Sequence, residues 1–124
     1  MTLAGGQYIC EEDGAVIAAF ALDNDPQGSF QQACWSRLLE DGSYLVIHAL
    51  AIDPQMQKHG LGSEIVRFCI NKAGSDGYKA IRVDVVPTNI PARRLFEKNG
   101  FSYAGDLDLG IDNIPSFSLY ELNL

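Results

Sequence analysis

The sequence predicts an α/β or α+β fold in which helices pack on a mixed β-sheet. Apolar runs of strand length alternate with amphipathic stretches of helix length, and turn-forming residues separate them. The 124 residues suit one domain, 1–124, and 47% hydrophobic residues can bury one core. The runs follow one another as strand, strand, short helix, strand, helix, strand, helix, strand and strand.

The first part of the chain predicts a hairpin and a short helix. Residues 7–10 form a short strand, and Gly14 supplies the turn that follows it. Residues 15–22 are almost uninterruptedly apolar, which indicates a strand buried on both faces. After a breaker cluster, the helical spacing of Phe30, Ala33 and Cys34 predicts a short helix within residues 29–39.

The middle of the chain holds the strongest strand and the clearest helix. Residues 44–52 are long, rich in strand-forming residues and closed by Asp53-Pro54. A helix is expected to begin near Gly60 or Leu61 and to end at Gly74 and Gly77. Its apolar stripe consists of Leu61, Ile65, Phe68, Cys69 and Ala73.

The last part predicts a strand, a helix and two further strands. Residues 81–86 form a strand that Pro87 ends. Pro91 suits the first turn of a helix over 91–98, with Asn89 near its cap. Residues 101–104 and 116–122 are expected to be strands, joined by a turn-rich loop or a hairpin.

Composition excludes several classes of function. A net charge of −7 argues against nucleic-acid binding, and it favours a cationic or amine-bearing substrate. The three cysteines form no C-x-x-C pair, so we expect buried or half-buried thiols and no metal site. Without an apparent signal peptide or membrane span, we expect a cytoplasmic protein without a membrane partner.

The most informative segment is the loop over residues 53–63, between the strong strand and the clear helix. Gly60 and Gly62 leave backbone N–H groups uncovered at the start of this helix, and its dipole favours an anion such as a pyrophosphate there. The P-loop pattern does not occur, and Ile65 stands where a dinucleotide-binding motif needs a third glycine. A tight strand-to-helix turn that binds no ligand is the structural alternative.

Two ordered motifs carry a family resemblance. Gln57-x-x-Gly60-x-Gly62 matches a Gln/Arg-x-x-Gly-x-Gly/Ala signature. The block from Asn89 to Phe101 is similar to N-x-x-A-x-x-L-Y/F-E-K-x-G-F. Both are signatures of the GNAT family of acyl-CoA N-acyltransferases, which the chain resembles over residues 8–122 and most sharply over 44–101.

The resemblance implies a mixed, mostly antiparallel sheet with splayed central strands and helices on both faces. It also implies N-acetyl transfer, in which a primary amine attacks the thioester of acetyl-CoA directly and no metal takes part. The pantetheine arm of the coenzyme would lie in the wedge between the splayed strands.

The resemblance further implies a set of coenzyme-binding residues. These are Leu50, Ala51, Ile52, Gln57, Lys58, His59, Gly60, Leu61, Gly62, Ser63, Asn89, Ala92 and Phe96. The strand residues would bond the acetyl and pantetheine amides through their backbone, and the loop amides would hold the pyrophosphate. Asn89 would reach the pantetheine, and Ala92 and Phe96 would pack near the thioester.

His48 is the candidate general base, because the family often places a Glu at this point of the central strand. An imidazole can accept the ammonium proton directly or through water. The alternative is a hydrogen-bonded structural histidine, and Tyr44 and Glu12 are weaker candidates.

The general acid is less clear from the sequence. Phe96 stands where the family commonly has a tyrosine that protonates the leaving thiolate, and phenylalanine has no proton to give. The thiolate could leave unassisted, take a proton from water, or take one from Tyr103 or Tyr120, either of which could equally be a packing residue.

Three further residues are notable for their chemistry. Arg82 and the nearby Asp84 alternate on one strand face and are expected to be structural. Trp35 lines an acceptor pocket or anchors the segment around it.

One departure from the family pattern bears on function. Only six residues precede the first predicted strand, so the first strand and helices of the family are apparently missing. The chain could be a truncated product, a minimal member completed by a second subunit, or a non-catalytic acyl-CoA-binding module. An uncovered sheet face and edge would favour a homodimer; a strictly monomeric sedimentation profile would count against it.

Overall fold

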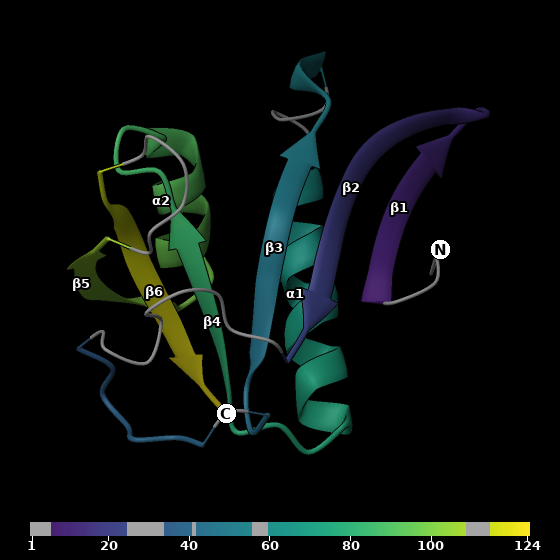
Figure 1. Ribbon diagram of the computed structural model, residues 1–124. Helices are drawn as coiled ribbons and strands as arrows, with labels where there is room; N and C mark the ends of the chain where they lie inside the picture. The colour runs from purple at the N-terminus through teal and green to yellow at the C-terminus, as the bar shows by residue number, and fades with distance from the viewer. Residues whose placement is uncertain (1–5, 25–33, 41, 56–59, 109–114) are drawn as a thin grey trace.

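The computed structural model describes residues 6–24, 34–40, 42–55, 60–108 and 115–124, with Ala49 described by its backbone alone. These residues form six strands and two helices (Figure 1). Along the chain they are β1 Gln7–Glu12, β2 Ala15–Asp23, β3 Leu45–Ile52, α1 Leu61–Ser75, β4 Ala80–Val85, α2 Ile90–Lys98, β5 Ser102–Leu107 and β6 Phe117–Asn123.

The strands form one sheet in the order β1-β2-β3-β4-β6-β5. Every neighbouring pair is antiparallel except β3 and β4, which are parallel and are joined through α1. The predicted mixed, mostly antiparallel sheet is therefore confirmed. Both described helices lie behind the sheet in Figure 1, so within the described residues helices cover one face and not both.

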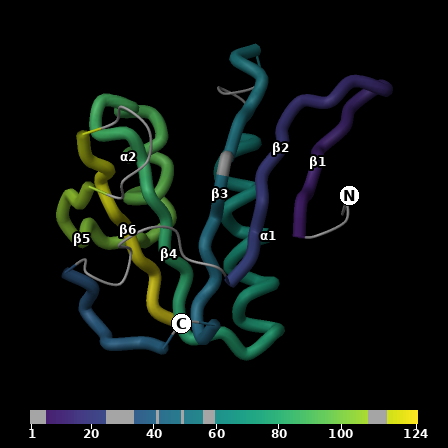
Figure 2. The backbone as a smooth tube through the Cα atoms, viewed as in Figure 1, coloured from purple at the N-terminus to yellow at the C-terminus, as the bar shows by residue number. Residues whose placement is uncertain are grey.

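Apolar side chains fill a core on each face of the sheet. On the helix face, α1 contributes Ile65, Val66 and Cys69, and α2 contributes Phe96. On the other face, a smaller cluster from the strands packs with residues 34–40. Figure 2 shows this segment passing the lower ends of β4 and β6.

The segment before β3 corrects one prediction. Residues 34–39 form no helix, and residues 29–33 of the expected helix lie outside the described residues. Long-range hydrogen bonds hold this irregular segment, which bends at Ser36 and Arg37: the Ser36 amide donates to Glu121 Oε1 at 2.8 Å, and Arg37 Nη1 donates to the Lys79 carbonyl at 3.0 Å. These bonds replace the local ones that a helix would have made.

Burial along β2 corrects a second prediction. Ala18, Phe20 and Leu22 are buried, whereas the alternate residues Ile17 and Ala19 are only half-buried. The strand is therefore buried on the helix face alone, because no described helix covers its other side.

Two smaller corrections concern α1 and the cysteines. The helix continues through Gly74 and ends at Ser75, just before Gly77 with its φ of 82°. Cys69 is buried and Cys10 half-buried as expected, but Cys34 is exposed. Burial raises the pKa of the Cys69 thiol to about 12, so this thiol stays protonated in the core.

A buried arginine fastens residues 34–40 to the sheet. Arg82 on β4 is 0% exposed, and its guanidinium carbon lies 4.4 Å from the Trp35 ring centroid and 4.3 Å from that of Tyr44. Its Nη2 donates to the Arg37 carbonyl at 2.8 Å, and its Nε lies 4.0 Å from Glu121 Oε2. Arg82 is therefore structural, and Trp35 anchors its segment.

We expect Arg82→Met to lower the free energy of unfolding by roughly 3–5 kcal/mol, because it leaves the Glu121 carboxylate buried without a countercharge. Urea unfolding measures the change. The double variant Arg82→Met/Glu121→Leu should recover much of the loss, since no unpaired charge remains. A single variant as stable as the wild type would show that the two charges are not coupled.

Candidate functional site

The two central strands separate partway along their length. The parallel pairing of β3 with β4 consists of Leu45 with Ile81, Val46 with Arg82 and Ile47 with Val83. Beyond these pairs β3 continues to Ile52 and β4 to Val85, and Figure 1 shows the two strands diverging. The edge of β3 that faces this fork therefore has backbone groups that β4 does not use.

A β-bulge lies in β3 beside the fork. Ala49 and Leu50 together lie opposite Phe20 of β2, between the pairs Ala21–His48 and Ala19–Ala51. The extra residue reverses the alternation of side chains. Ile47, before the bulge, and Leu50, within it, both pack against the helix-face core. His48 lies on the opposite face of the sheet.

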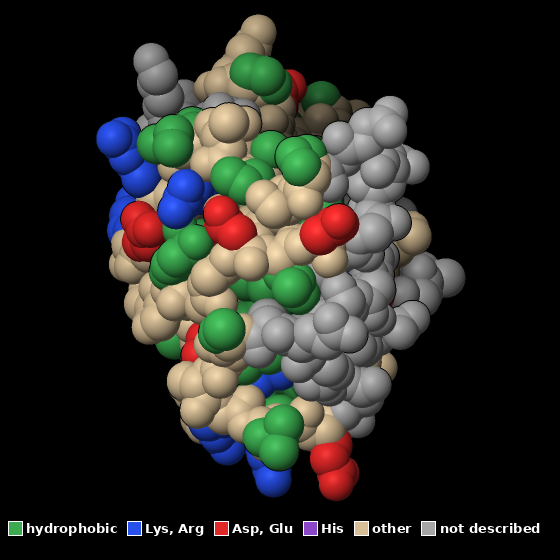
Figure 3. Space-filling model, turned by 60° about the vertical axis from the view of Figure 1, so that its left-hand side comes forward, with side chains coloured by type: hydrophobic (Ala, Val, Ile, Leu, Met, Phe, Trp, Pro, Cys, Tyr) green, Lys and Arg blue, Asp and Glu red, His purple; other side chains and the backbone are tan. Residues whose placement is uncertain are grey.

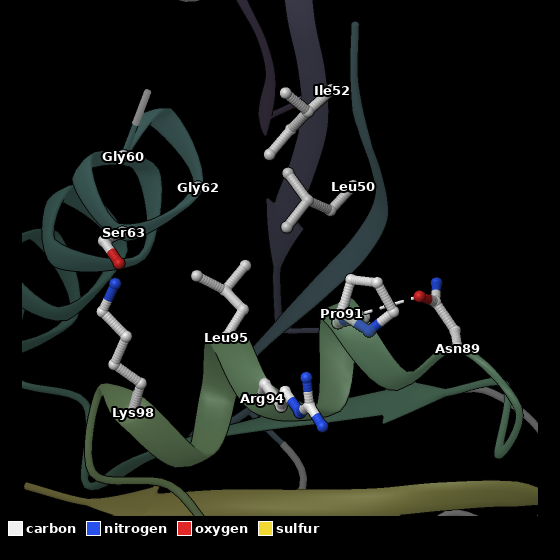
Figure 4. Close-up of a pocket in the computed structure, with 11 residues that line it drawn as sticks. Leu50, Ile52, Gly60, Gly62, Ser63, Asn89, Pro91, Arg94, Leu95 and Lys98 are labelled. Carbon is white, nitrogen blue, oxygen red and sulfur yellow. Dashed lines mark hydrogen bonds between the residues drawn. The ribbon is translucent and has the colours of Figure 1, made fainter. Parts of the chain in front are cut away.

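A cavity of about 390 Å³ lies beside this end of β3, between the first turn of α1 and one face of α2 (Figure 4). Its size is within the range of small-molecule sites. Its lining consists of Leu50, Ile52, Gly60, Gly62, Ser63, Asn89, Pro91, Ala92, Arg94, Leu95 and Lys98.

Two glycines shape the wall that α1 contributes. Gly60 is the N-cap residue of α1 and has a left-handed φ of 77°. A Cβ on Gly62 would lie 3.1 Å from a methyl carbon of Leu95 and 3.3 Å from one of Ile52, so glycine keeps the space between the two helices and β3 open. The absence of a side chain at both positions lets a ligand approach the backbone closely.

The first turn of α1 presents amide donors to the cavity. Among the described residues, none accepts a hydrogen bond from the backbone N–H of Leu61, Gly62 or Ser63; the first helical bond runs from Glu64 to Gly60. Such unpaired amides, together with the positive end of the helix dipole, form a site for an anion.

Asn89 shapes the opposite end of the cavity. Its Oδ1 accepts a hydrogen bond from the Ala92 amide at 3.2 Å and so caps α2, with Pro91 in the first turn as predicted. The side-chain NH₂ group of Asn89 remains a donor for a ligand.

The structure brings together most of the predicted binding residues that it describes. Leu50, Ile52, Gly60, Gly62, Ser63, Asn89 and Ala92 all line the cavity. Gln57, Lys58 and His59 lie outside the described residues.

Three predicted binding residues do not line the cavity. Ala51 pairs with Ala19 of β2, and Leu61 packs against the helix-face core. Phe96 is only 4% exposed, and its ring packs edge-on against Phe101. Its position follows from the helix, since Phe96 lies on the side of α2 that faces the sheet.

Sequence reasoning missed four of the lining residues. Pro91, Arg94, Leu95 and Lys98 follow one another at helical spacing, so a single face of α2 forms the wall. The spacing was visible in the sequence, but only the structure shows which face turns towards β3.

His48 lies on the other face of the sheet, at the base of the fork. Its Nε2 is 3.0 Å from Asp23 Oδ1, and its side chain is 14% exposed. Asp84 is the next residue of β4 after the last pair and lies close enough to interact with His48. Burial raises the pKa of the Asp84 carboxyl, which the charge of His48 partly offsets.

The other proton-transfer candidates lie elsewhere. Tyr44 is fully buried against Arg82, and Glu12 is exposed at the end of β1. Neither residue lines the cavity.

The two candidate tyrosine acids are engaged in a separate network. The Tyr120 hydroxyl donates to Glu97 Oε2 at 2.8 Å and accepts from Arg93 Nε at 3.0 Å. The Tyr103 hydroxyl donates to Asp106 at 2.8 Å. These bonds hold both hydroxyls beside β5 and β6, outside the cavity lining.

Charges are mixed on the face shown in Figure 3, where Lys and Arg side chains lie among Asp and Glu. The described residues include no group of three or more His, Cys, Asp or Glu side chains placed to hold a metal ion.

None of the helices in the described segments is long and apolar enough to cross a membrane.

Comparison with known proteins gives one family. Residues 2–101 match the model of the acetyltransferase (GNAT) family. No curated protein sequence matches the chain significantly.

Solved structures share the fold at low sequence identity. A GCN5-related N-acetyltransferase from Kribbella flavida is 19% identical, with a TM-score of 0.71 over 100% of this chain and 72% of its own. An N-acetyltransferase from Staphylococcus aureus Mu50 is 20% identical, with a TM-score of 0.70 over 94% and 66%. YncA from Salmonella typhimurium, solved with its cofactor acetyl-CoA, is 16% identical, with a TM-score of 0.70 over 95% and 64%.

Gly60, the N-cap residue of α1, and Gly74, inside the helix, provide a matched stability test. No atom lies within 4 Å of a Cβ added at either, so only the backbone conformation distinguishes them. Gly60→Ala should cost about 1–2 kcal/mol because its φ is left-handed. Gly74→Ala, inside the helix, should stabilise the protein by roughly 0.5–1 kcal/mol. Urea unfolding that shifted both variants in the same direction would contradict the described start of α1.

Proposed function

Because this chain belongs to the GNAT family of acetyltransferases, we propose that it transfers the acetyl group of acetyl-CoA to a primary amine. The observation that carries the proposal is the cavity between the end of β3, the first turn of α1 and α2. It combines an anion site, an apolar wall and strand edges that β4 leaves unpaired.

The cavity residues fit the parts of the coenzyme in order. The amides of Gly60 to Ser63, with those of residues 57–59, hold the pyrophosphate. The backbone of Leu50 and Ile52 bonds the amides of the pantetheine arm along the fork. Asn89 donates to the same arm, and Leu95 packs against it.

The fork connects this cavity with the face that carries His48. Acetyl-CoA supplies a thioester carbonyl, and a backbone N–H near Leu50 stabilises the negative charge that develops on its oxygen. The acceptor amine approaches from the face of His48, which takes its proton directly or through water. The amine nitrogen bonds to the carbonyl carbon as the carbon–sulfur bond breaks, and the thiolate leaves and takes a proton from water.

Asp23 gives His48 a defined orientation in this scheme. Its carboxylate lies 3.0 Å from Nε2, which directs the proton of a neutral imidazole to that nitrogen. Nδ1 is then the atom that accepts a proton. Asp84 lies near His48, across the base of the fork, on the face from which the acceptor approaches.

One observation favours a second candidate, a module that binds acyl-CoA without turnover. Phe96 has no hydroxyl where the family commonly has a tyrosine, and no described tyrosine lines the cavity.

Homodimerisation is also part of the proposal. The dimer surface would include the half-buried Ile17 and Ala19, on the face of β2 that no described helix covers.

Thiol release from acetyl-CoA with a panel of primary amines tests the proposal. We expect release that depends on the amine, and Gly62→Val should weaken acetyl-CoA binding by at least about tenfold, because its side chain fills the gap beside Leu95. Gly74→Val, elsewhere on the same helix, is the matched control and should bind normally. Tight binding without release across the panel would support the module, and no binding by the wild type would exclude both functions.

The pH–rate profile tests the role of His48. His48→Gln should lower kcat by about a hundredfold at neutral pH and remove the limb at acid pH, because the proton acceptor is lost. Asp23→Asn should lower kcat as well, because the carboxylate no longer directs the imidazole proton to Nε2. A profile that neither variant changes would assign both residues to structure alone.

A further inference from the structure

Two cations lie on the wall of the cavity that α2 forms. Arg94 and Lys98 are exposed, stand one helical turn apart and both line the cavity. In Figure 4 the Lys98 ammonium lies beside the Ser63 side chain, at the first turn of α1, and Arg94 lies farther along α2 towards Pro91.

Neither cation is neutralised within the described part of the chain, where no carboxylate lies within 4.0 Å of either one. Arg93, the neighbour on the same helix, donates instead to Tyr120 and to the Pro87 carbonyl. Lys72 of α1 pairs with Asp76. In a protein with a net charge of −7, two such cations at one cavity attract an anion there.

The other parts of the cavity already have partners in the proposed complex. In that complex the amides of Gly62 and Ser63 bind the pyrophosphate, and Leu50 and Leu95 contact the uncharged pantetheine arm. Neither the pyrophosphate nor the pantetheine arm therefore requires Arg94 or Lys98. Lys98 lies at the pyrophosphate end, beside Ser63, and Arg94 lies one turn away on the same wall. In the proposed complex the adenosine part of the coenzyme extends beyond the pyrophosphate, and that part carries one more phosphate.

We propose that Arg94 and Lys98 bind the 3′-phosphate of the coenzyme and make the protein selective for CoA over dephospho-CoA. A phosphate monoester carries about two negative charges at neutral pH. The guanidinium offers a planar pair of donors that matches phosphate, and the ammonium adds a mobile point charge. The inference rests on the proposed binding of acetyl-CoA and adds to it the recognition of a second anionic group.

Calorimetry with CoA and with dephospho-CoA tests the inference. The wild type should bind CoA about tenfold more tightly than dephospho-CoA, and added salt should reduce this difference. Arg94→Gln/Lys98→Gln should weaken CoA binding by about tenfold and leave dephospho-CoA binding within about twofold of the wild type. Arg67→Gln, an exposed cation of α1 outside the lining, is the matched control and should change neither affinity.

Two results would overturn the inference alone. The first is equal wild-type affinity for the two ligands. The second is an equal loss for both ligands in the double variant, which would assign the cations to the pyrophosphate that the ligands share. Failure of the wild type to bind either ligand would overturn the proposed function itself, and the inference with it.

Discussion

The end of hydrogen bonding between β3 and β4 is the constraint on which the rest of the site depends. The two strands pair over three residues and then part, while each keeps its other neighbour, β2 or β6. The sheet therefore stays whole although its centre opens. Beyond the opening β3 and β4 no longer use each other's backbone groups, although interior strands normally pair on both sides. A ligand with amides along its length can supply partners for these groups.

The bulge in β3 gives the fork two different sides. Because Ala49 and Leu50 together oppose one residue of β2, Leu50 and Ile52 turn towards the helices and His48 turns away from them. One strand thus serves the cavity on one face and presents the imidazole on the other. In our account the coenzyme and the acceptor approach from opposite faces and meet in the fork. The two helices complete the cavity on the coenzyme side, with amides from α1 and with Asn89, Ala92 and Leu95 from α2 and its cap.

The parts of the fold that local signals determine could be predicted from the sequence. Gly60 ahead of an apolar stripe placed the start of α1, and Asn89 with Pro91 placed that of α2. The segment 34–40 could not be predicted in this way, because its conformation depends on Glu121 and Lys79, which are 85 and 42 residues from their partners.

The candidate site, like the fold, has parts that the sequence predicts and parts that it does not. Motif spacing predicted the glycines at the start of α1 and Asn89 at the start of α2, and the structure places all of them in the lining of the cavity. It did not predict that Phe96 is buried or that Arg94 and Lys98 line the cavity, because the sequence does not show which face of α2 turns towards β3 and which towards the core. The bulge was equally invisible, since no residue type marks it. Only the pairing with β2 shows that Leu50, and not Ala51, shares a face with Ile47.

Hydrogen–deuterium exchange with and without acetyl-CoA tests the central claim most directly. If the coenzyme lies in the fork, it should slow exchange at the amides of residues 48–52 on β3 and of residues 60–63 at the start of α1. The edge strand β1, which is separated from β3 by β2, should keep its exchange rates. Unchanged exchange along β3 in protein that is shown to bind acetyl-CoA would contradict the account, because the coenzyme would then lie elsewhere.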